Sequence, residues 1–108
     1  MGQLLYGNAP AIRIDDWALA HLQAVIITKL RRDEAFTFSW ADEDGIDGVV
    51  SGGKLAKASP GMIWISRSSA LYFSFDTDRD RPLNRRWLVD LVDLANGSGG
   101  LRLLPEPQ

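Results

Sequence analysis

Cysteine is missing from this chain of 108 residues, and histidine occurs once. Without cysteine the protein has no disulfide, no thiol nucleophile and no thiolate metal site. His21 is the only residue available for imidazole acid–base chemistry, and no serine lies in a nucleophile-elbow pattern. We therefore predict a protein that is not an enzyme, with no catalytic residue, no cofactor and no metal.

Excess charge and long apolar runs are missing as well. The chain has 12 Lys and Arg against 14 Asp and Glu, a formal net charge of −2. This balance provides neither the basic coat that displaces counterions from nucleic acids nor a polybasic membrane anchor. The most apolar region, residues 18–30, is too short to span a bilayer, which needs about 20 apolar residues. We predict no membrane association. With no cysteine and no signal-peptide pattern, a cytoplasmic location is favoured.

The residues that are present are those of one globular domain. Hydrophobic residues make up 45% of the chain and charged residues 24%, which excludes a disordered segment. Four Trp, four Phe and two Tyr supply large side chains for a core. We predict a single domain over residues 1–104, with a long Gly-rich loop at 41–61 and a flexible tail at 105–108.

Hydrophobic periodicity predicts the order of elements ββαβββαβ. The expected strands are residues 3–6, 11–14, 35–40, 62–66, 71–75 and 101–104, with hairpin turns at 7–10 and 67–70. The expected helices run from Asp15 or Asp16 to about Arg32 and from about Asn84 to Ala95, where Asn96-Gly97 supplies a left-handed stop. This pattern predicts an α+β fold of two layers, an antiparallel sheet with two helices on one face.

The face of the predicted sheet that points away from the helices carries two aromatic and two basic residues. Alternation places Trp64 and Tyr72 there together with Arg13 and Arg102. Aromatic side chains interleaved with arginine stack on the bases of single-stranded nucleic acids. The same residue types form protein interfaces and homodimers, and we favour the interpretation that this face binds a protein. The expected partner is a protein or a second copy, with DNA as the alternative.

A second candidate surface lies on the first predicted helix. Trp17, His21, Thr28 and Arg32 fall near the side opposite the central apolar stripe. A histidine in mid-helix is more often structural than functional, so we favour a structural role for His21. The alternative is that His21 belongs to a contact surface.

A basic cluster between residues 79 and 86 is the third candidate. It consists of Arg79, Arg81, Arg85 and Arg86. Neighbouring aspartates offset its charge, so it adds only a little to a nucleic-acid function.

Two partial motifs are incomplete. Residues 48–54 match much of a phosphate-binding loop, but Leu55 stands where that motif needs Ser or Thr for Mg²⁺. Residues 76–80 alternate carboxylates like the start of a calcium loop, but Arg81 stands where that loop needs glycine. We expect a Gly-rich loop and an acidic turn instead of a nucleotide-hydrolysing or metal site.

Five segments, which include the block His-Leu-x-x-Val-Ile, show a familiar pattern: residues 1–7, 19–32, 36–40, 83–87 and 96–101. These segments resemble a family of short actinobacterial proteins of uncharacterised function, often named ATP-dependent DNA ligases. The resemblance implies at most an association with DNA repair. A ligase is adenylated at the lysine of a Lys-x-Asp-Gly motif. Asp42 and Gly45 occupy the lysine positions before the two Asp-Gly pairs, so we predict no ligase activity.

Overall fold

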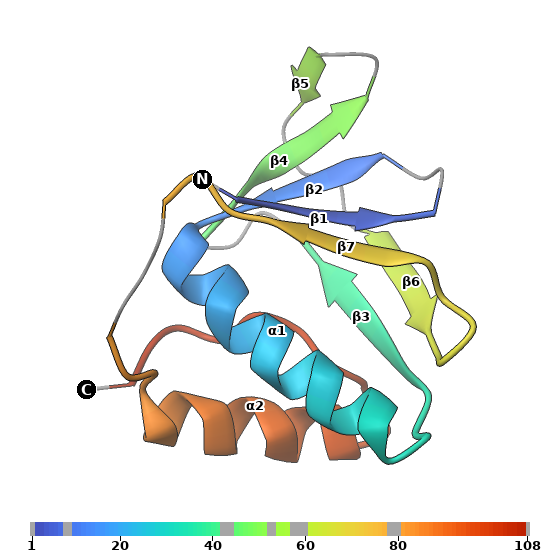
Figure 1. The fold of residues 1–108 in the computed structure, drawn as a ribbon, viewed down its shortest axis with the longest axis vertical. Helices are drawn as coiled ribbons and strands as arrows, with labels where there is room; N and C mark the ends of the chain where they lie inside the picture. Colours follow the sequence, from blue (N-terminus) through green and yellow to red (C-terminus); the bar gives the residue numbers. More distant parts are fainter. Residues whose placement is uncertain are drawn as a thin grey trace.

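The computed structural model describes residues 2–7, 10–41, 45–51, 54–56, 61–77 and 81–107. In these residues two helices pack with two antiparallel sheets (Figure 1), which confirms the predicted α+β class. The helices are α1 (Asp16–Arg31) and α2 (Arg85–Asn96). The strands are β1 (Gly2–Tyr6), β2 (Ala11–Ile14), β3 (Phe36–Trp40), β4 (Ile46–Ser51), β5 (Lys54–Ala56), β6 (Gly61–Ile65) and β7 (Leu71–Ser74).

The larger sheet has five strands in the order β5-β4-β2-β1-β7, and every neighbouring pair is antiparallel. The predicted hairpin between β1 and β2 is confirmed by the pairing of Leu4 with Ile12. Both side chains are buried on the inner face of the sheet, where α1 packs. Residues on the other face therefore point away from the helices.

The loop predicted at residues 41–61 is wrong where β4 and β5 lie. β4 pairs with β2 and continues into a hairpin with β5, in which Val50 is opposite Leu55. Glycines and acidic residues around these short strands obscured their alternation. Their pairing depends on β2, more than thirty residues away, because an isolated two-stranded hairpin is marginal in water. The hairpin also rules out the strand–loop–helix unit of a phosphate-binding loop.

The predicted hairpin between the strands at 62–66 and 71–75 is wrong, and the single predicted sheet is two sheets. β6 pairs with β3, with Trp64 opposite Thr37, whereas β7 pairs with β1. The turn between them, closed by a hydrogen bond from Ser69 N to Ser66 O, crosses from one sheet to the other. A short connection is compatible with a hairpin, but strand pairing is decided by the fit of both strands to the core.

The last predicted strand, residues 101–104, is reduced to a bridge. Leu101 lies parallel to Phe38, donates its N–H to Thr37 O over 2.8 Å and accepts from Ser39 N over 3.0 Å. The segment therefore covers the free edge of β3.

Both helices begin at the predicted caps. The side chain of Asp15 accepts from Ala18 N, and that of Asn84 accepts from the backbone of the first turn of α2. The left-handed stop predicted at Gly97 is wrong, because its φ is −82°. Gly100 takes the left-handed conformation instead, with φ of +77°. A Cβ atom there would lie 2.8 Å from Thr37 O, so this backbone passes too close to β3 for any side chain.

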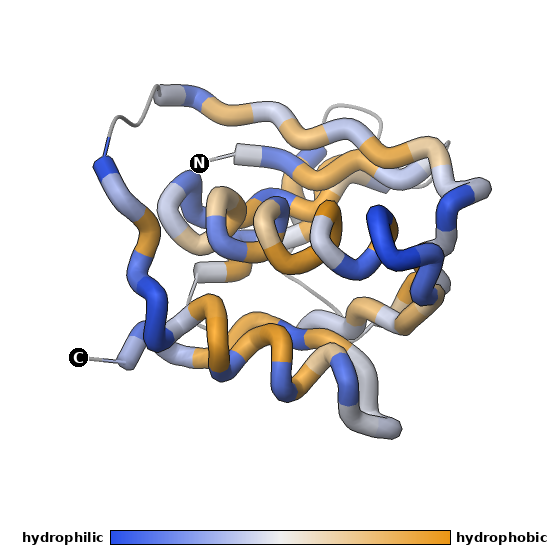
Figure 2. The backbone as a smooth tube through the Cα atoms, turned by 60° about the horizontal axis from the view of Figure 1, so that its bottom comes forward, coloured by the Kyte–Doolittle hydropathy of each residue, from blue (hydrophilic) through white to orange (hydrophobic). Residues whose placement is uncertain are grey.

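The core lies between the larger sheet, β3 and the two helices. In α2 the buried residues Trp87, Leu91 and Ala95 recur every four positions, and apolar and hydrophilic residues alternate along this helix in Figure 2. The largest fully buried apolar side chains come from both layers: Leu4, Ile12, Ile14, Leu19, Leu22, Ile26, Phe38, Ile65, Leu91 and Leu101. Among the helices of the described residues, none has the length and hydropathy to span a membrane.

Candidate functional site

The platform predicted from Trp64, Tyr72, Arg13 and Arg102 is divided between the two sheets, so the prediction of one shared face is wrong. Tyr72 and Arg13 lie on the outer face of the larger sheet, because β1 pairs Leu5 with Tyr72 and Gln3 with Arg13. Trp64 lies on the smaller sheet. The bridge of Leu101 to Phe38 places exposed Arg102 on the Trp64 side of that sheet, since neighbouring residues alternate.

An apolar row crosses the outer face of the larger sheet. Register pairs Leu55 with Val50, Val50 with Ala11, and Leu5 with Tyr72, and the register of β1 with β2, continued by one residue, places Leu5 beside buried Ala11. At the two ends of this apolar row, Leu55 is 47% exposed and Tyr72 is 65% exposed. Arg13 lies one row away and pairs with Asp47, with 3.3 Å between Nε and Oδ2. The outer face thus has an apolar centre beside an ion pair.

His21 is not a surface residue, so the predicted contact stripe on α1 is wrong at its centre. Its ring is fully buried, and Nε2 accepts a hydrogen bond from Asn84 N over 2.8 Å. Nδ1 lies 2.7 Å from Trp17 O and is therefore the protonated nitrogen that donates to it. The ring also lies 4.5 Å from that of Trp87. This geometry supports the structural interpretation of His21.

Trp17 is half-buried under the C-terminal segment. Its indole N–H donates to Glu106 Oε2 over 2.9 Å, and the Arg81 guanidinium stacks 3.6 Å from its ring centre. Asn84 Nδ2 donates to Glu106 and to Pro107 O, so the tail predicted to be flexible is anchored through residue 107. The hydrogen bond from Trp17 is the main reason why the pKa of Glu106 is lowered. A pocket of about 440 Å³ lies beside these residues.

The predicted arginine cluster is spread over different environments. The Arg81 guanidinium stacks on the Trp17 ring. Arg85 and Arg86 are exposed in the first turn of α2, and Arg79 lies outside the described residues. Arg32, the last residue of the predicted stripe, is exposed and lies 3.7 Å from Glu34.

Asp16 is buried at the start of α1 and holds the segment that follows β7. Its carboxylate accepts from the Thr77 hydroxyl over 2.9 Å and from the Thr77 and Asp76 backbone N–H groups. Burial, the largest single cause, raises the pKa of this carboxyl group. The lowering causes, led by the hydrogen bond from the Thr77 hydroxyl, together outweigh it, so the pKa is lowered.

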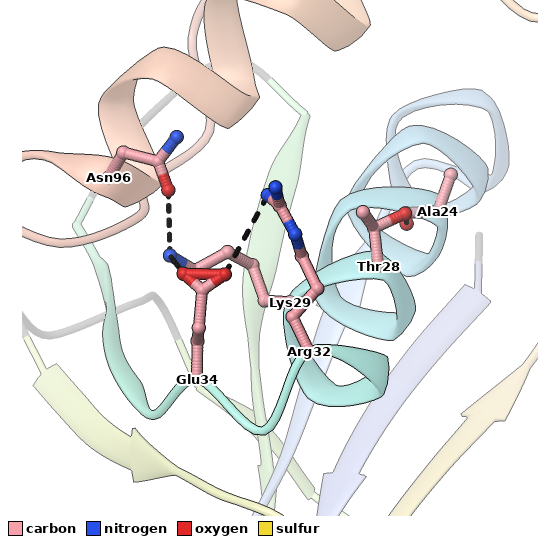
Figure 3. A network of polar contacts seen from close by, with 6 residues as sticks. All are labelled: Ala24, Thr28, Lys29, Arg32, Glu34 and Asn96. Carbon is pink, nitrogen blue, oxygen red and sulfur yellow. Dashed lines mark hydrogen bonds and ion pairs between the residues drawn. The ribbon is translucent and has the colours of Figure 1, made fainter.

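Sequence reasoning missed the buried lysine of α1. Lys29 is only 5% exposed, and its ammonium group donates to Asn96 Oδ1 over 2.7 Å and to Glu34 Oε2 over 3.2 Å (Figure 3). It also lies 5.9 Å from the centre of the Phe36 ring. The signal in the sequence was a lysine at helical spacing from Val25 and Ile26, within the apolar stripe.

A pocket of about 260 Å³ opens beside Lys29. It is bounded by the end of α1, the end of α2 with its glycine turn, and the smaller sheet. Its lining is Lys29, Ala35, Phe36, Thr37, Trp64, Ala95, Asn96, Gly97, Ser98 and Gly100. Trp64, a predicted binding residue, therefore stands beside a polar cavity that the sequence did not reveal.

The fold and these sites define a small α+β domain with a buried polar network and, within the described ranges, no cluster of side chains suited to a metal ion. The chain belongs to the family described as Domain of unknown function (DUF7882), whose model matches residues 1–106. That description names no activity. Comparison with curated proteins and with solved structures gave no match.

Proposed function

We propose that this protein is a non-catalytic binding module that pairs with a second copy through the outer face of its larger sheet. The observation that carries this proposal is the apolar row from Leu55 to Tyr72, whose ends are exposed on the face opposite the helices. Exposed apolar side chains on one face are typical of interaction surfaces.

A second copy suits this face better than a partner of one charge. Beside the apolar row, Arg13 and Asp47 present a cation and an anion 3.3 Å apart. A twofold axis brings each such group near its opposite in the other copy, which satisfies the isologous geometry of homodimers. The net charge of −2 opposes association only weakly.

The dimension of the face sets the expected strength of pairing. Five strands about 4.8 Å apart span about 20 Å, and strands of three to six residues are about 10 to 20 Å long. The resulting area is below the roughly 800 Å² per partner of a standard stable interface. We therefore expect a weak dimer whose population rises with concentration.

Sedimentation velocity over a range of concentrations tests this proposal. Tyr72→Glu places a charge in the row and is expected to abolish the dimer. Val89→Glu is the matched control, because Val89 is 57% exposed on α2, compared with 65% for Tyr72 on β7. A wild type that stays monomeric at every concentration, or equal loss in both variants, contradicts the proposal.

Nucleic-acid binding is the second candidate, favoured by Trp64, which is 58% exposed on the same side of the smaller sheet as Arg102. An aromatic platform beside arginine stacks on bases and contacts phosphate. Fluorescence anisotropy with labelled single-stranded, duplex and nicked DNA tests it at low and high salt. Salt-sensitive binding weakened by Trp64→Ala supports this function, and a preference for nicked DNA supports a role near ligation. Absence of binding at low salt contradicts it.

A further inference from the structure

We propose that the pocket beside Lys29 binds a planar ring carrying an anionic group, the chemistry of a nucleotide unit. The pocket is lined both by residues that carry hydrogen-bond donors, among them Lys29 and Asn96, and by Trp64. It shares no residue with the apolar row of the larger sheet, so this inference is independent of dimerisation and deepens the nucleic-acid candidate.

The donors come from three elements. Lys29 has three N–H groups, and Asn96 and Glu34 take up two of them. The side-chain amide of Asn96 accepts from Lys29 through Oδ1, whereas its Nδ2 makes no hydrogen bond to any described residue. Thr37 and Ser98, which both carry hydroxyl groups, also line the pocket. An acceptor-rich group such as phosphate matches this set of donors.

The local charge also favours an anion. Glu34 lies within ion-pair distance of both Lys29 and Arg32, as Figure 3 shows, so one carboxylate is shared by two cations. The carbonyl ends of α1 and α2 oppose an anion through their dipoles. Lys29, inside the last turn of α1 and in contact with the last residue of α2, offsets that field at both helix ends.

Trp64 supplies the site for the ring. It stands opposite Thr37 in the pairing of β6 with β3, lines the pocket and is 58% exposed. We place the ring on this indole and its anionic substituent among the donors that line the same pocket. Stacking of this kind accepts any base, because every base has a π-face.

The turn after α2 keeps the opposite wall of the pocket close to β3. Leu101 N donates to Thr37 O, and the left-handed Gly100 allows this approach. Among the described residues, the backbone N–H groups of Ser98 and Gly99 take part in no hydrogen bond. The backbone N–H of Ser98, a residue that lines the pocket, thus adds to the side-chain donors.

Nuclear magnetic resonance titration of the full chain tests the site with three probes: inorganic phosphate, adenosine and adenosine 5′-monophosphate. We expect the monophosphate to shift the resonances of Trp64, Asn96 and Ser98 and to bind about tenfold more tightly than either part alone. Trp64→Ala is expected to weaken the monophosphate about tenfold. Val89→Ala, at a position on α2 that is 57% exposed and does not line the pocket, is expected to leave binding unchanged.

Asn96→Asp separates a binding role from a structural one. Aspartate keeps an acceptor for Lys29 and so preserves the link between the helices, but it places a negative charge in the pocket. We expect the fold, monitored by the spectrum, to persist and monophosphate binding to be lost. If this variant loses the native spectrum, Ser98→Asp is used instead, because it introduces the same charge at an exposed residue of the turn.

Comparison with a short single-stranded oligonucleotide distinguishes the source of the ligand. Tighter binding of the strand, with the same resonances shifted, assigns the site to a nucleotide within a chain, whereas equal affinity assigns it to a free nucleotide. The proposal is overturned if the monophosphate shifts none of these resonances. It is also overturned if Trp64→Ala and Val89→Ala weaken binding equally, or if Asn96→Asp binds as the wild type does.

Discussion

The backbone N–H of Asn84 donates to Nε2 of buried His21, across 2.8 Å and 63 positions of sequence. Asn84 is also the N-cap of α2 and holds Glu106 and Pro107 through its side-chain amide. One histidine therefore ties α1, the start of α2 and the C-terminal segment into a single polar network. Both ring nitrogens of His21 have a hydrogen-bond partner, which makes the members of this network sensitive to substitution.

His21→Leu is expected to destabilise the protein by about 2 kcal/mol, because it leaves Asn84 N without its acceptor in a buried position. Urea denaturation measures this loss. Thr28→Ala, at an exposed position of the same helix, serves as the control and is expected to change stability by less than about 0.5 kcal/mol. Equal stability of His21→Leu and wild type would show that the network contributes nothing.

The lowered pKa of Asp16 predicts acid sensitivity. A carboxyl group with a lower pKa in the folded state contributes stability that is present above its unfolded value, near 3.8, and lost as pH falls through the folded pKa. Thermal unfolding of the wild type is therefore expected to lose stability below about pH 4.

Asp16→Asn removes the negative charge that accepts hydrogen bonds from Thr77 and Asp76. We expect this variant to be less stable than the wild type at neutral pH by about 2 kcal/mol, since hydrogen bonds to charged groups are the stronger ones. The difference should shrink as the pH falls below 4. Asp93→Asn, at an exposed position on α2, controls for general loss of a carboxylate. A difference that stays constant with pH refutes the linkage.

Gly100→Ala is expected to destabilise the protein by more than about 1 kcal/mol, because alanine is strained at a φ of +77° and its Cβ would collide with Thr37. Gly99→Ala is the matched control, since a Cβ atom there meets nothing within 4 Å. Chemical denaturation of the two variants compares adjacent glycines of one turn. Similar stabilities would mean that the close approach to β3 is not required.

Glu106 is expected to hold the C-terminal segment in place. Glu106→Ala removes the acceptor of the Trp17 indole N–H and of the Asn84 amide, so the Trp17 indole proton should exchange faster with solvent. Glu106→Gln keeps an oxygen acceptor and should retain most of the protection. Hydrogen exchange followed by nuclear magnetic resonance gives the comparison, and unchanged exchange in Glu106→Ala would show that the segment is held by other contacts.

Helices were the most predictable elements from sequence. The apolar spacing in α1 and α2, with Asp15 and Asn84 as caps, lies within each helix and depends on no distant partner. The strand at 36–40 and the hairpin of β1 with β2 were predictable for the same reason. β4 and β5 were not, because short strands containing glycine are stabilised by neighbours that the local pattern does not include.

The candidate site was predicted only in part. Exposure of Trp64 and Tyr72 followed from alternation, but their separation into two sheets followed from the pairing of β6 with β3 and of β7 with β1. The burial of Lys29 could not be predicted from the sequence for a related reason. Lysine is rarely buried unless it is paired, and its partner Asn96 lies 67 positions away.

The sequence alone determined the class of this protein: the α+β composition, the two helices with their caps, and the lack of cysteine. These properties reside in local spacing and residue chemistry. Only the tertiary structure decided which strands pair, where His21 and Lys29 are buried, and which aromatic residue stands beside the polar pocket. Burial, hydrogen-bond satisfaction and charge pairing are settled between residues distant in the chain, and no local pattern contains that information.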